Sequence, residues 1–272
     1  MIFGLEWRLL FELLSLGVFA GFLAGLLGIG GGLIIVVFMT LLLTSKGMPS
    51  QYVVKIAIAT SLATICFTSA SSVRSHHKRG AVRWDIVRLL APGILAGSVL
   101  AAQVVKALPT QVLTIVFTIF IGFSGTQMLI DRKPRPSRQL PGSAGMFGAG
   151  GVIGGLSALV GGGGGFVSVP FMTWCNVPIH NAVATSAALG FPIALAGTLG
   201  YIVAGWSIPD LPPGTIGFVY LPALLTIAAA SVLSAPLGAR AAHGLKVVHL
   251  KRIFALMLYA VAAFMLYKSI SG

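Results

Sequence analysis

Long apolar stretches separated by short polar segments make up almost the whole of this chain. Eight stretches are long enough to enter a lipid bilayer, at 13–44, 55–73, 86–106, 111–130, 144–175, 182–204, 215–239 and 253–270. A helix needs about 20 residues to cross roughly 30 Å of hydrocarbon, so six of the stretches fit single spans. The pattern therefore predicts an all-α polytopic membrane protein.

The first and fifth stretches, 13–44 and 144–175, differ from the others in length and in glycine content. Each has 32 residues, which as one straight helix would measure about 48 Å, too long for one span and too short for two. Glycines interrupt each stretch near its middle, at Gly28 and 30–32 in the first and at 161–165 in the second. Because each glycine costs a helix about 1 kcal/mol relative to alanine, we expect two half-helices joined by an irregular turn in each stretch.

The same two stretches belong to an internal repeat. The segment GLLGIGGGLIIVVFM (25–39) matches ALVGGGGGFVSVPFM (158–172) without a gap. Two further matches follow in the same order: Ala59-Thr60-Ser61 with Ala184-Thr185-Ser186, and 97–117 with 234–254. We therefore divide the chain into a first transmembrane repeat (1–130), a basic linker (131–143) and a second transmembrane repeat (144–272).

Charged residues are scarce, and most of them are positive. The chain is 57% hydrophobic and 8% charged, with 18 Lys plus Arg against 5 Asp plus Glu and a formal net charge of +13. Soluble proteins carry about 25% charged residues, so this composition excludes a soluble enzyme, a disordered protein and a secreted disulfide scaffold. A nucleic-acid partner is not expected, because no basic segment lies in a soluble region large enough to fold.

The positions of the basic residues predict a topology. Thirteen of the 18 lie in the loops 74–88, 131–143 and 240–252, and such loops are expected to be cytoplasmic. All three share one face only if each glycine-broken stretch counts as a pair of segments, which gives five segments in each half. An odd number inverts the second half relative to the first, so we expect two inverted-topology repeats with both termini outside.

Inverted repeats with broken helices at matching positions are typical of the midplane site of a secondary transporter. A glycine break exposes backbone N–H groups at the positive end of a half-helix, and these groups bind an anion without a buried cation. The alternative is that the glycines only permit close helix packing. The predicted substrate-binding residues are Gly30, Gly31, Gly32, Gly163, Gly164 and Gly165 through their amides, Thr60, Ser61, Asn181, Thr185 and Ser186 through their side chains, and Gln103 and Arg240 through longer-range assistance.

Other interpretations of these residues stay open. In the alternative interpretation the hydroxyls donate to a backbone carbonyl of their own helix, as hydroxyls in membrane helices usually do. Arg240 then extends its side chain to the polar interface of the membrane instead of assisting anion binding. Carboxylates are almost absent from the spans, which argues against a proton relay and against cation or metal transport, and no cofactor is expected. The rival functions are a passive anion channel built on the same glycine ends and an intramembrane hydrolase with Ser157 as nucleophile and His180 as base.

The paired motifs GFLAGLLGIGGGLIIVVFM (21–39) and GGLSALVGGGGGFVSVPFM (154–172), with AVATS at 182–186, resemble the sulfite exporter TauE/SafE family of bacterial membrane permeases. The resemblance covers both halves. It implies a multi-pass inner-membrane carrier of sulfur-containing anions such as sulfite, sulfoacetate or related organosulfonates. For the oligomeric state, the sequence leaves both a monomer and a homo-oligomer as alternatives. One departure is Val37-Phe38, where the family usually has the Pro-Phe of the second motif, so we expect unequal roles for the two halves.

Overall fold

The computed structural model describes residues 7–27, 31–130 and 138–241, together with 252, 255, 256, 258–260 and 262–264; the side chains of 25–27 and 238–241 lie outside this description. The elements are α1 (Trp7–Leu27), α2 (Gly32–Ser45), α3 (Ser50–Lys78), α4 (Trp84–Ala107), α5 (Thr110–Ile130), α6 (Ser143–Val160), α7 (Gly165–Trp174), α8 (Ile179–Gly205), β1 (Thr215–Ile216), β2 (Val219–Tyr220) and α9 (Leu221–Ala241).

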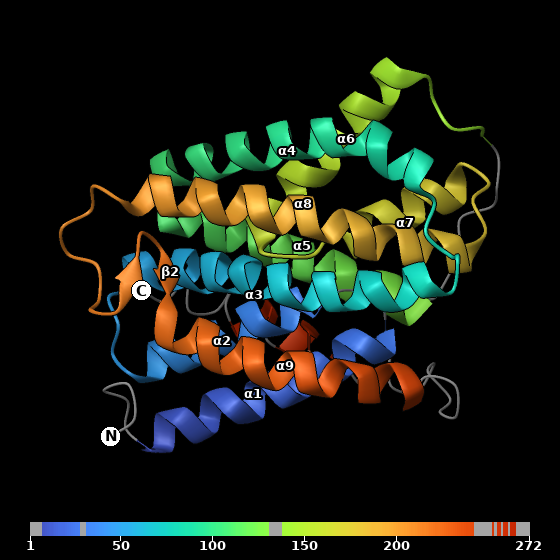
Figure 1. Cartoon of the computed structure of the whole chain (residues 1–272). Helices are drawn as coiled ribbons and strands as arrows, with labels where there is room; N and C mark the ends of the chain where they lie inside the picture. The colour runs from blue at the N-terminus through green and yellow to red at the C-terminus, as the bar shows by residue number, and fades with distance from the viewer. Residues whose placement is uncertain are drawn as a thin grey trace.

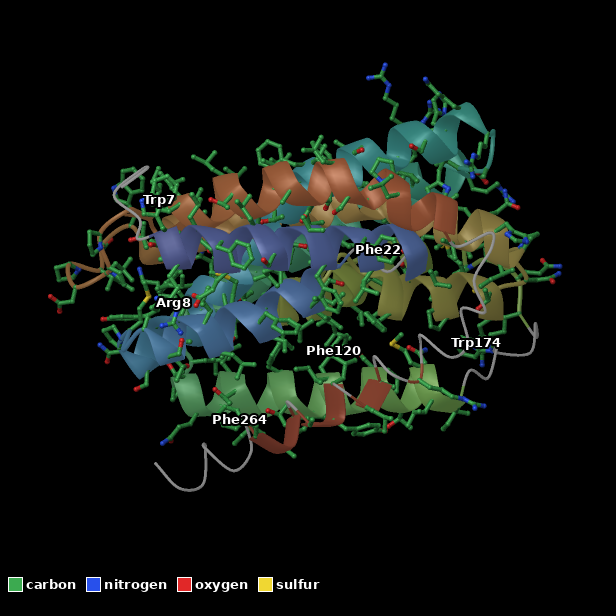
Figure 2. All side chains as sticks on the ribbon, turned by 90° about the horizontal axis from the view of Figure 1, so that it is seen from below. Trp7, Arg8, Phe22, Phe120, Trp174 and Phe264 are labelled. Atoms are coloured by element: carbon green, nitrogen blue, oxygen red, sulfur yellow. The ribbon has the colours of Figure 1, made fainter. Side chains whose placement is uncertain are left out.

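The prediction of an all-helical membrane protein is confirmed. Within the described part of the chain, six helices are long and apolar enough to cross a membrane: α1, α3, α4, α5, α6 and α8. Two shorter apolar helices, α2 and the Leu221–Leu237 part of α9, accompany them. Figure 2 shows the charged side-chain tips gathered at the two ends of the molecule and carbon along its flanks, as a lipid-facing surface requires. A two-residue antiparallel ladder of β1 and β2 precedes α9.

Both predicted glycine breaks are present. Helix α1 ends at Leu27 and α2 begins at Gly32, while α6 ends at Val160 and α7 begins at Gly165. Positive φ angles at Gly31 (64°), Gly161 (69°) and Gly164 (81°) turn the chain there, and glycine adopts this backbone conformation without the steric cost that a Cβ adds. The consecutive glycines therefore end one helix and start the next.

Each broken pair folds back as a hairpin. Lys46, which follows α2, has its Nζ 3.9 Å from Oε2 of Glu12 near the start of α1. At the other hairpin, the backbone N–H of Arg138, shortly before α6, donates to the carbonyl of Trp174, the last residue of α7 (3.3 Å). The chain thus enters and leaves each hairpin at the same end of the molecule, and the two breaks lie in its interior.

A helix of each half packs along a helix of the other half. Helix α1 lies along α9 and α6 lies along α4, at opposite edges of the bundle (Figure 1). A methyl group at Gly17 would approach the Ile227 carbonyl oxygen to 2.8 Å, and one at Gly150 would approach the Leu90 carbonyl oxygen to 2.4 Å. When the repeat alignment is extended without a gap, Gly17 corresponds to Gly150 and Leu90 to Ile227. The same close contact is therefore made twice, with the halves exchanged.

Helix α3 crosses its repeat partner α8 at the centre of the bundle. A methyl group at Gly197 would lie 2.9 Å from Leu62, and one at Gly190 would lie 3.5 Å from the Cβ of Ser69. Because positions on α8 fall as those on α3 rise, the two helices run antiparallel. Both are largely enclosed by the rest of the protein.

The two ends of the molecule differ in charge. At one end the side-chain amide of Asn181 donates to the carbonyl of Ala81 (2.9 Å), within the basic segment 74–88, and Arg138 lies over the ring of Trp174. At the other end the Thr110 hydroxyl donates to the carbonyl of Gln51 (2.6 Å), next to loops that carry few charges. The described basic segments therefore share one end, while most of 240–252 lies outside the described residues.

Candidate functional site

The two glycine breaks contact each other in the interior. A methyl group at Gly32 would come within 2.5 Å of the carbonyl oxygen of Gly161. The hydroxyl of Ser61, on α3, lies 2.9 Å from the carbonyl oxygens of both Gly32 and Gly161. At Gly161 a methyl group would approach the Cα of Ile58 to 3.1 Å. The contact between the breaks therefore depends on glycine on each side and on one serine that joins them.

The hydroxyl hydrogen of Ser61 is engaged by carbonyl oxygens of the protein itself. A serine hydroxyl has one hydrogen to donate, and both printed partners of Ser61 are carbonyl oxygens. The residue is completely buried. In this conformation Ser61 therefore holds the first break to the second and has no hydrogen left for an anion.

The N-terminus of α7 presents unused backbone donors. The N–H of Gly162 donates to the carbonyl of Ser157 (3.0 Å), and that of Ser168 donates to the carbonyl of Gly164 (2.8 Å). Among the described hydrogen bonds, none uses the N–H groups between these two points, at 163–166, although all four residues are buried. An unpartnered buried N–H costs about 1–3 kcal/mol, and the helix macrodipole makes this end positive. The arrangement fits an anion.

The start of α2 has the same backbone turn as the start of α7. The N–H of Ile35 donates to the carbonyl of Gly31 (3.2 Å), whereas the carbonyls one turn before residues 32–34 belong to 28–30, which lie outside the described residues. Gly31 has the same left-handed backbone as its repeat partner Gly164. Each break thus places the N-terminal, positive end of a helix in the interior, and the start of α2 lies against Gly161 of the second break.

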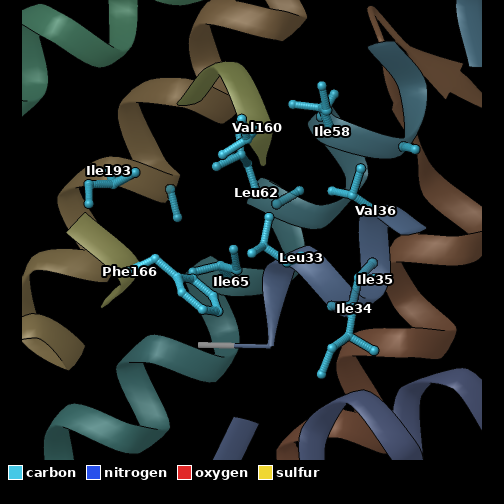
Figure 3. Close-up of a cluster of buried hydrophobic side chains, with 14 of the residues drawn as sticks. Leu33, Ile34, Ile35, Val36, Ile58, Leu62, Ile65, Val160, Phe166 and Ile193 are labelled. Atoms are coloured by element: carbon cyan, nitrogen blue, oxygen red, sulfur yellow. The ribbon is translucent and has the colours of Figure 1, made fainter. Parts of the chain in front are cut away.

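Apolar side chains enclose both breaks. Figure 3 shows Leu33 and Ile65 close to Phe166 on one side, with Val160 and Ile193 nearby. Each of these side chains is at most 8% exposed. An environment of low polarity strengthens a hydrogen bond to a charged group and raises the cost of a polar group that has none. The shell therefore increases the effect of any ligand at the free amides.

The two breaks differ in their hydroxyl groups. Near the second break, Ser168 on α7 donates from its hydroxyl to that of Ser186 on α8 (2.8 Å). Ser157, at the end of α6, has a buried hydroxyl with no partner among the described residues. The repeat partners in the first half are Ile35 for Ser168 and Ala24 for Ser157. The second break is therefore the more polar of the two.

Comparison with known proteins identifies the family. The model of the family described as "Sulfite exporter TauE/SafE" matches residues 13–265. This chain belongs to the TauE/SafE family. A "Probable membrane transporter protein" of Haemophilus influenzae is 38% identical over 258 residues, which cover 94% of this chain and 97% of the relative. A relative of the same description from Methanocaldococcus jannaschii is 28% identical over 276 residues, covering 98% and 100%. No solved structure matches this chain.

Membership of the TauE/SafE family makes the chain a membrane transporter and not an enzyme. Ser157 is buried at the end of α6, whereas His180 is exposed at the start of α8, and no described hydrogen bond joins them. Within the described residues there is also no cluster of three metal-ligating side chains.

The threonines predicted for the site make equivalent contacts between the halves of this family member. The N–H of Tyr220, just before α9, donates to the Oγ1 of Thr60 (3.0 Å), and the N–H of Arg83, just before α4, donates to the Oγ1 of Thr185 (3.0 Å). Arg83 and Tyr220 correspond in the repeat, because α4 and α9 begin one residue later in each half. The recurrence of the threonines thus has a structural explanation, since each binds the entry of a helix from the other half.

The remaining predicted residues lie apart from the breaks or outside the described residues. Asn181 binds the α3–α4 turn. Gln103 is exposed on α4, and no described contact joins it to a break. Gly30 lies outside the described residues, as does the side chain of Arg240, whose backbone is near the end of α9.

Lys55 on α3 is a buried cation that the sequence patterns did not single out. Its side chain is 8% exposed. Its Nζ donates to the carbonyl of Leu108 at the end of α4 (3.2 Å) and lies 5.9 Å from the centre of the Phe218 ring. The described residues give it no ion pair with a carboxylate. Its signal in the sequence is a lysine between apolar residues, at the start of the stretch 55–73.

Proposed function

We propose that this TauE/SafE protein carries a small sulfur-containing oxyanion, such as sulfite or an organosulfonate, across the inner membrane of a bacterium by alternating access. The observation that carries the proposal is the set of buried, unpartnered N–H groups at the start of α7, facing the second glycine break. The family description supports the sulfur chemistry.

Backbone amides are neutral donors and are suited to binding an anion inside the membrane. An isolated charged side chain in hydrocarbon is costly, whereas backbone amides at a helix end bind an anion through partial charges. A hydrogen bond from an amide to a charged oxygen is worth about 1.5–3 kcal/mol. Gly163, Gly164 and Gly165 are the amides we assign to the anion, with Gly31 and Gly32 opposite them. Thr60, Thr185 and Ser61 are assigned to holding the breaks and the helix entries in position.

We further propose that the two halves are inverted repeats. The antiparallel crossing of the repeat partners α3 and α8 supports this, as does the exchange of the α1–α9 and α4–α6 contacts. In the proposed topology the loops 74–88, 131–143 and 240–252 are cytoplasmic. Rocking one hairpin against the other then opens the breaks to each side in turn, as in other inverted-repeat transporters.

Uptake by the purified protein in liposomes tests the proposal. We expect vesicles to accumulate ³⁵S-sulfite, with excess unlabelled sulfite or sulfoacetate competing and chloride not competing. Unlabelled sulfite loaded inside should accelerate entry of the label, because a carrier exchanges its substrate. Uptake without this acceleration would identify a passive channel, and no uptake of either sulfur anion would contradict the proposal.

A further inference from the structure

Ser157 has a buried hydroxyl directed at the second glycine break. The residue is 1% exposed, and its Oγ has no hydrogen-bond partner among the described residues. The position that a Cβ of Gly164 would occupy is 3.4 Å from this Oγ. The Ser157 carbonyl also accepts the N–H of Gly162 (3.0 Å), which ties the residue to the break.

The hydroxyl of Ser157 lacks the hydrogen bond that a serine in a membrane helix usually makes. Serine in a membrane helix normally donates to a carbonyl one turn earlier and so meets its own requirement, as Thr64 and Thr173 do in α3 and α7. Ser157 makes no such bond in the described structure. Leaving a buried hydroxyl without a partner costs about as much as a lost hydrogen bond. The hydroxyl therefore has a free hydrogen beside the buried amides of 163–166, which have no acceptor among the described hydrogen bonds either.

The equivalent place in the first half has no hydroxyl. Ala24 is the repeat partner of Ser157, and its Cβ would lie 2.8 Å from a methyl group at Gly31, the partner of Gly164. The geometry is thus the same in both breaks, but only the second has a side-chain donor. Packing α6 against the break does not require a hydroxyl, because Ala24 fills the equivalent place in the first half with a methyl group.

We propose that Ser157 donates a hydrogen bond to the transported oxyanion and that, with the amides of Gly163–Gly165, it makes the second break the binding subsite. This inference rests on the proposed function and specifies its site. The donors come from two elements, the end of α6 and the start of α7, so they engage two oxygens of one anion. The subsite therefore selects an oxyanion, such as sulfite or a sulfonate group, over a spherical halide.

Other buried hydroxyls provide the comparison. Ser98 and Ser124 are also fully buried and unpartnered among the described residues. Ser98 faces Gly154 where α4 crosses α6, its Oγ 2.9 Å from the position of a Gly154 Cβ, and does not adjoin a break. Ser98→Ala is therefore a matched control, since it removes the same group from the same helix pair.

The test is ³⁵S-sulfite uptake by Ser157→Ala and Ser98→Ala in liposomes, with the melting temperature of each ligand-free protein. Loss of a hydrogen bond to a charged oxygen predicts a KM about 10- to 100-fold higher for Ser157→Ala, with a nearly unchanged melting temperature. Ser98→Ala should keep its KM within about twofold. Ser157→Cys, which keeps a weak donor, should fall between Ser157→Ala and the wild type, and it replaces the alanine variant if that fails to fold.

Three results would overturn the inference. They are a wild-type KM in Ser157→Ala, an equal loss in Ser98→Ala, and a lowered melting temperature of Ser157→Ala without a change in KM. If the wild type itself transports neither sulfite nor sulfoacetate, the proposed function fails as well. Wild-type uptake that Ser157→Ala retains in full removes only the role of Ser157.

Discussion

Neighbouring glycines of the second break should differ sharply in their tolerance of alanine. Gly161 has a φ of 69°, and a methyl group there would lie 2.6 Å from Val36 and 3.1 Å from the backbone of Ile58. Gly162 has no positive φ, and its nearest neighbours would be 3.7 Å away or more. The same substitution therefore meets two environments, one strained and crowded and the other open.

The magnitude follows from two contributions. A left-handed backbone costs a residue with a Cβ about 1–2 kcal/mol, and forcing an extra methyl into a packed interior costs about 1–3 kcal/mol. Gly161→Ala should thus lose about 2–5 kcal/mol. Gly162→Ala should be neutral or gain about 0.4–1 kcal/mol, because alanine restricts the unfolded chain.

Thermal unfolding of the purified proteins in detergent measures the difference. A loss of 1 kcal/mol corresponds to about 2–4 °C for a protein of this size, so Gly161→Ala should melt several degrees below the wild type and Gly162→Ala should not. A wild-type melting temperature for both variants would refute the packing of the breaks described here. An equal loss in both would mean that any side chain in the glycine run is harmful, whatever its neighbours.

Three further predictions concern the contacts between the halves, all measured by thermal unfolding. Thr60→Val should lose about 1–3 kcal/mol, and Thr185→Val less, because the amide that Thr185 binds lies near the end of the molecule; unchanged stability in both would contradict their role at the helix entries. Gly150→Ala should melt lower, since its methyl would overlap α4, while Gly148→Ala, with nothing within 4 Å, should not; a reversed order would count against the crossing. Ser61→Ala should lose about 1–3 kcal/mol by removing the one hydroxyl hydrogen that the buried carbonyls of Gly32 and Gly161 share, and a wild-type melting temperature would show that the breaks hold without it.

Local patterns in the sequence were sufficient to predict the helices and breaks. Consecutive glycines destabilise a helix wherever they occur, so the ends of α1 and α6 could be located to within a few residues. Apolar length likewise identified the spans. The positions of the basic loops also implied that each broken stretch returns to the side where it began. The sequence did not predict the contacts that close each hairpin, such as that of Arg138 with Trp174, because they join residues far apart in the chain.

The candidate site was predicted in part, for the same reason. The repeat singled out Thr60 and Thr185, but their partners, Tyr220 and Arg83, belong to the opposite half, and no local pattern joins them. The role that we propose for Ser157 rests on its unpartnered hydroxyl beside the break, which no sequence pattern indicates. Recurrence in a repeat therefore indicated which positions are constrained, but not whether packing or a ligand constrains them.

The central claim, that the amides of the second break bind the transported anion, is tested most directly at Gly164. A methyl group there would lie 2.4 Å from Cδ1 of Ile193, which can move only as part of a side chain, and it would stand on a φ of 81°, so alanine strains the backbone that carries the amides. We expect folded Gly164→Ala, isolated by size exclusion, to lose ³⁵S-sulfite uptake in liposomes while Gly162→Ala retains it. Wild-type uptake by folded Gly164→Ala would contradict the account.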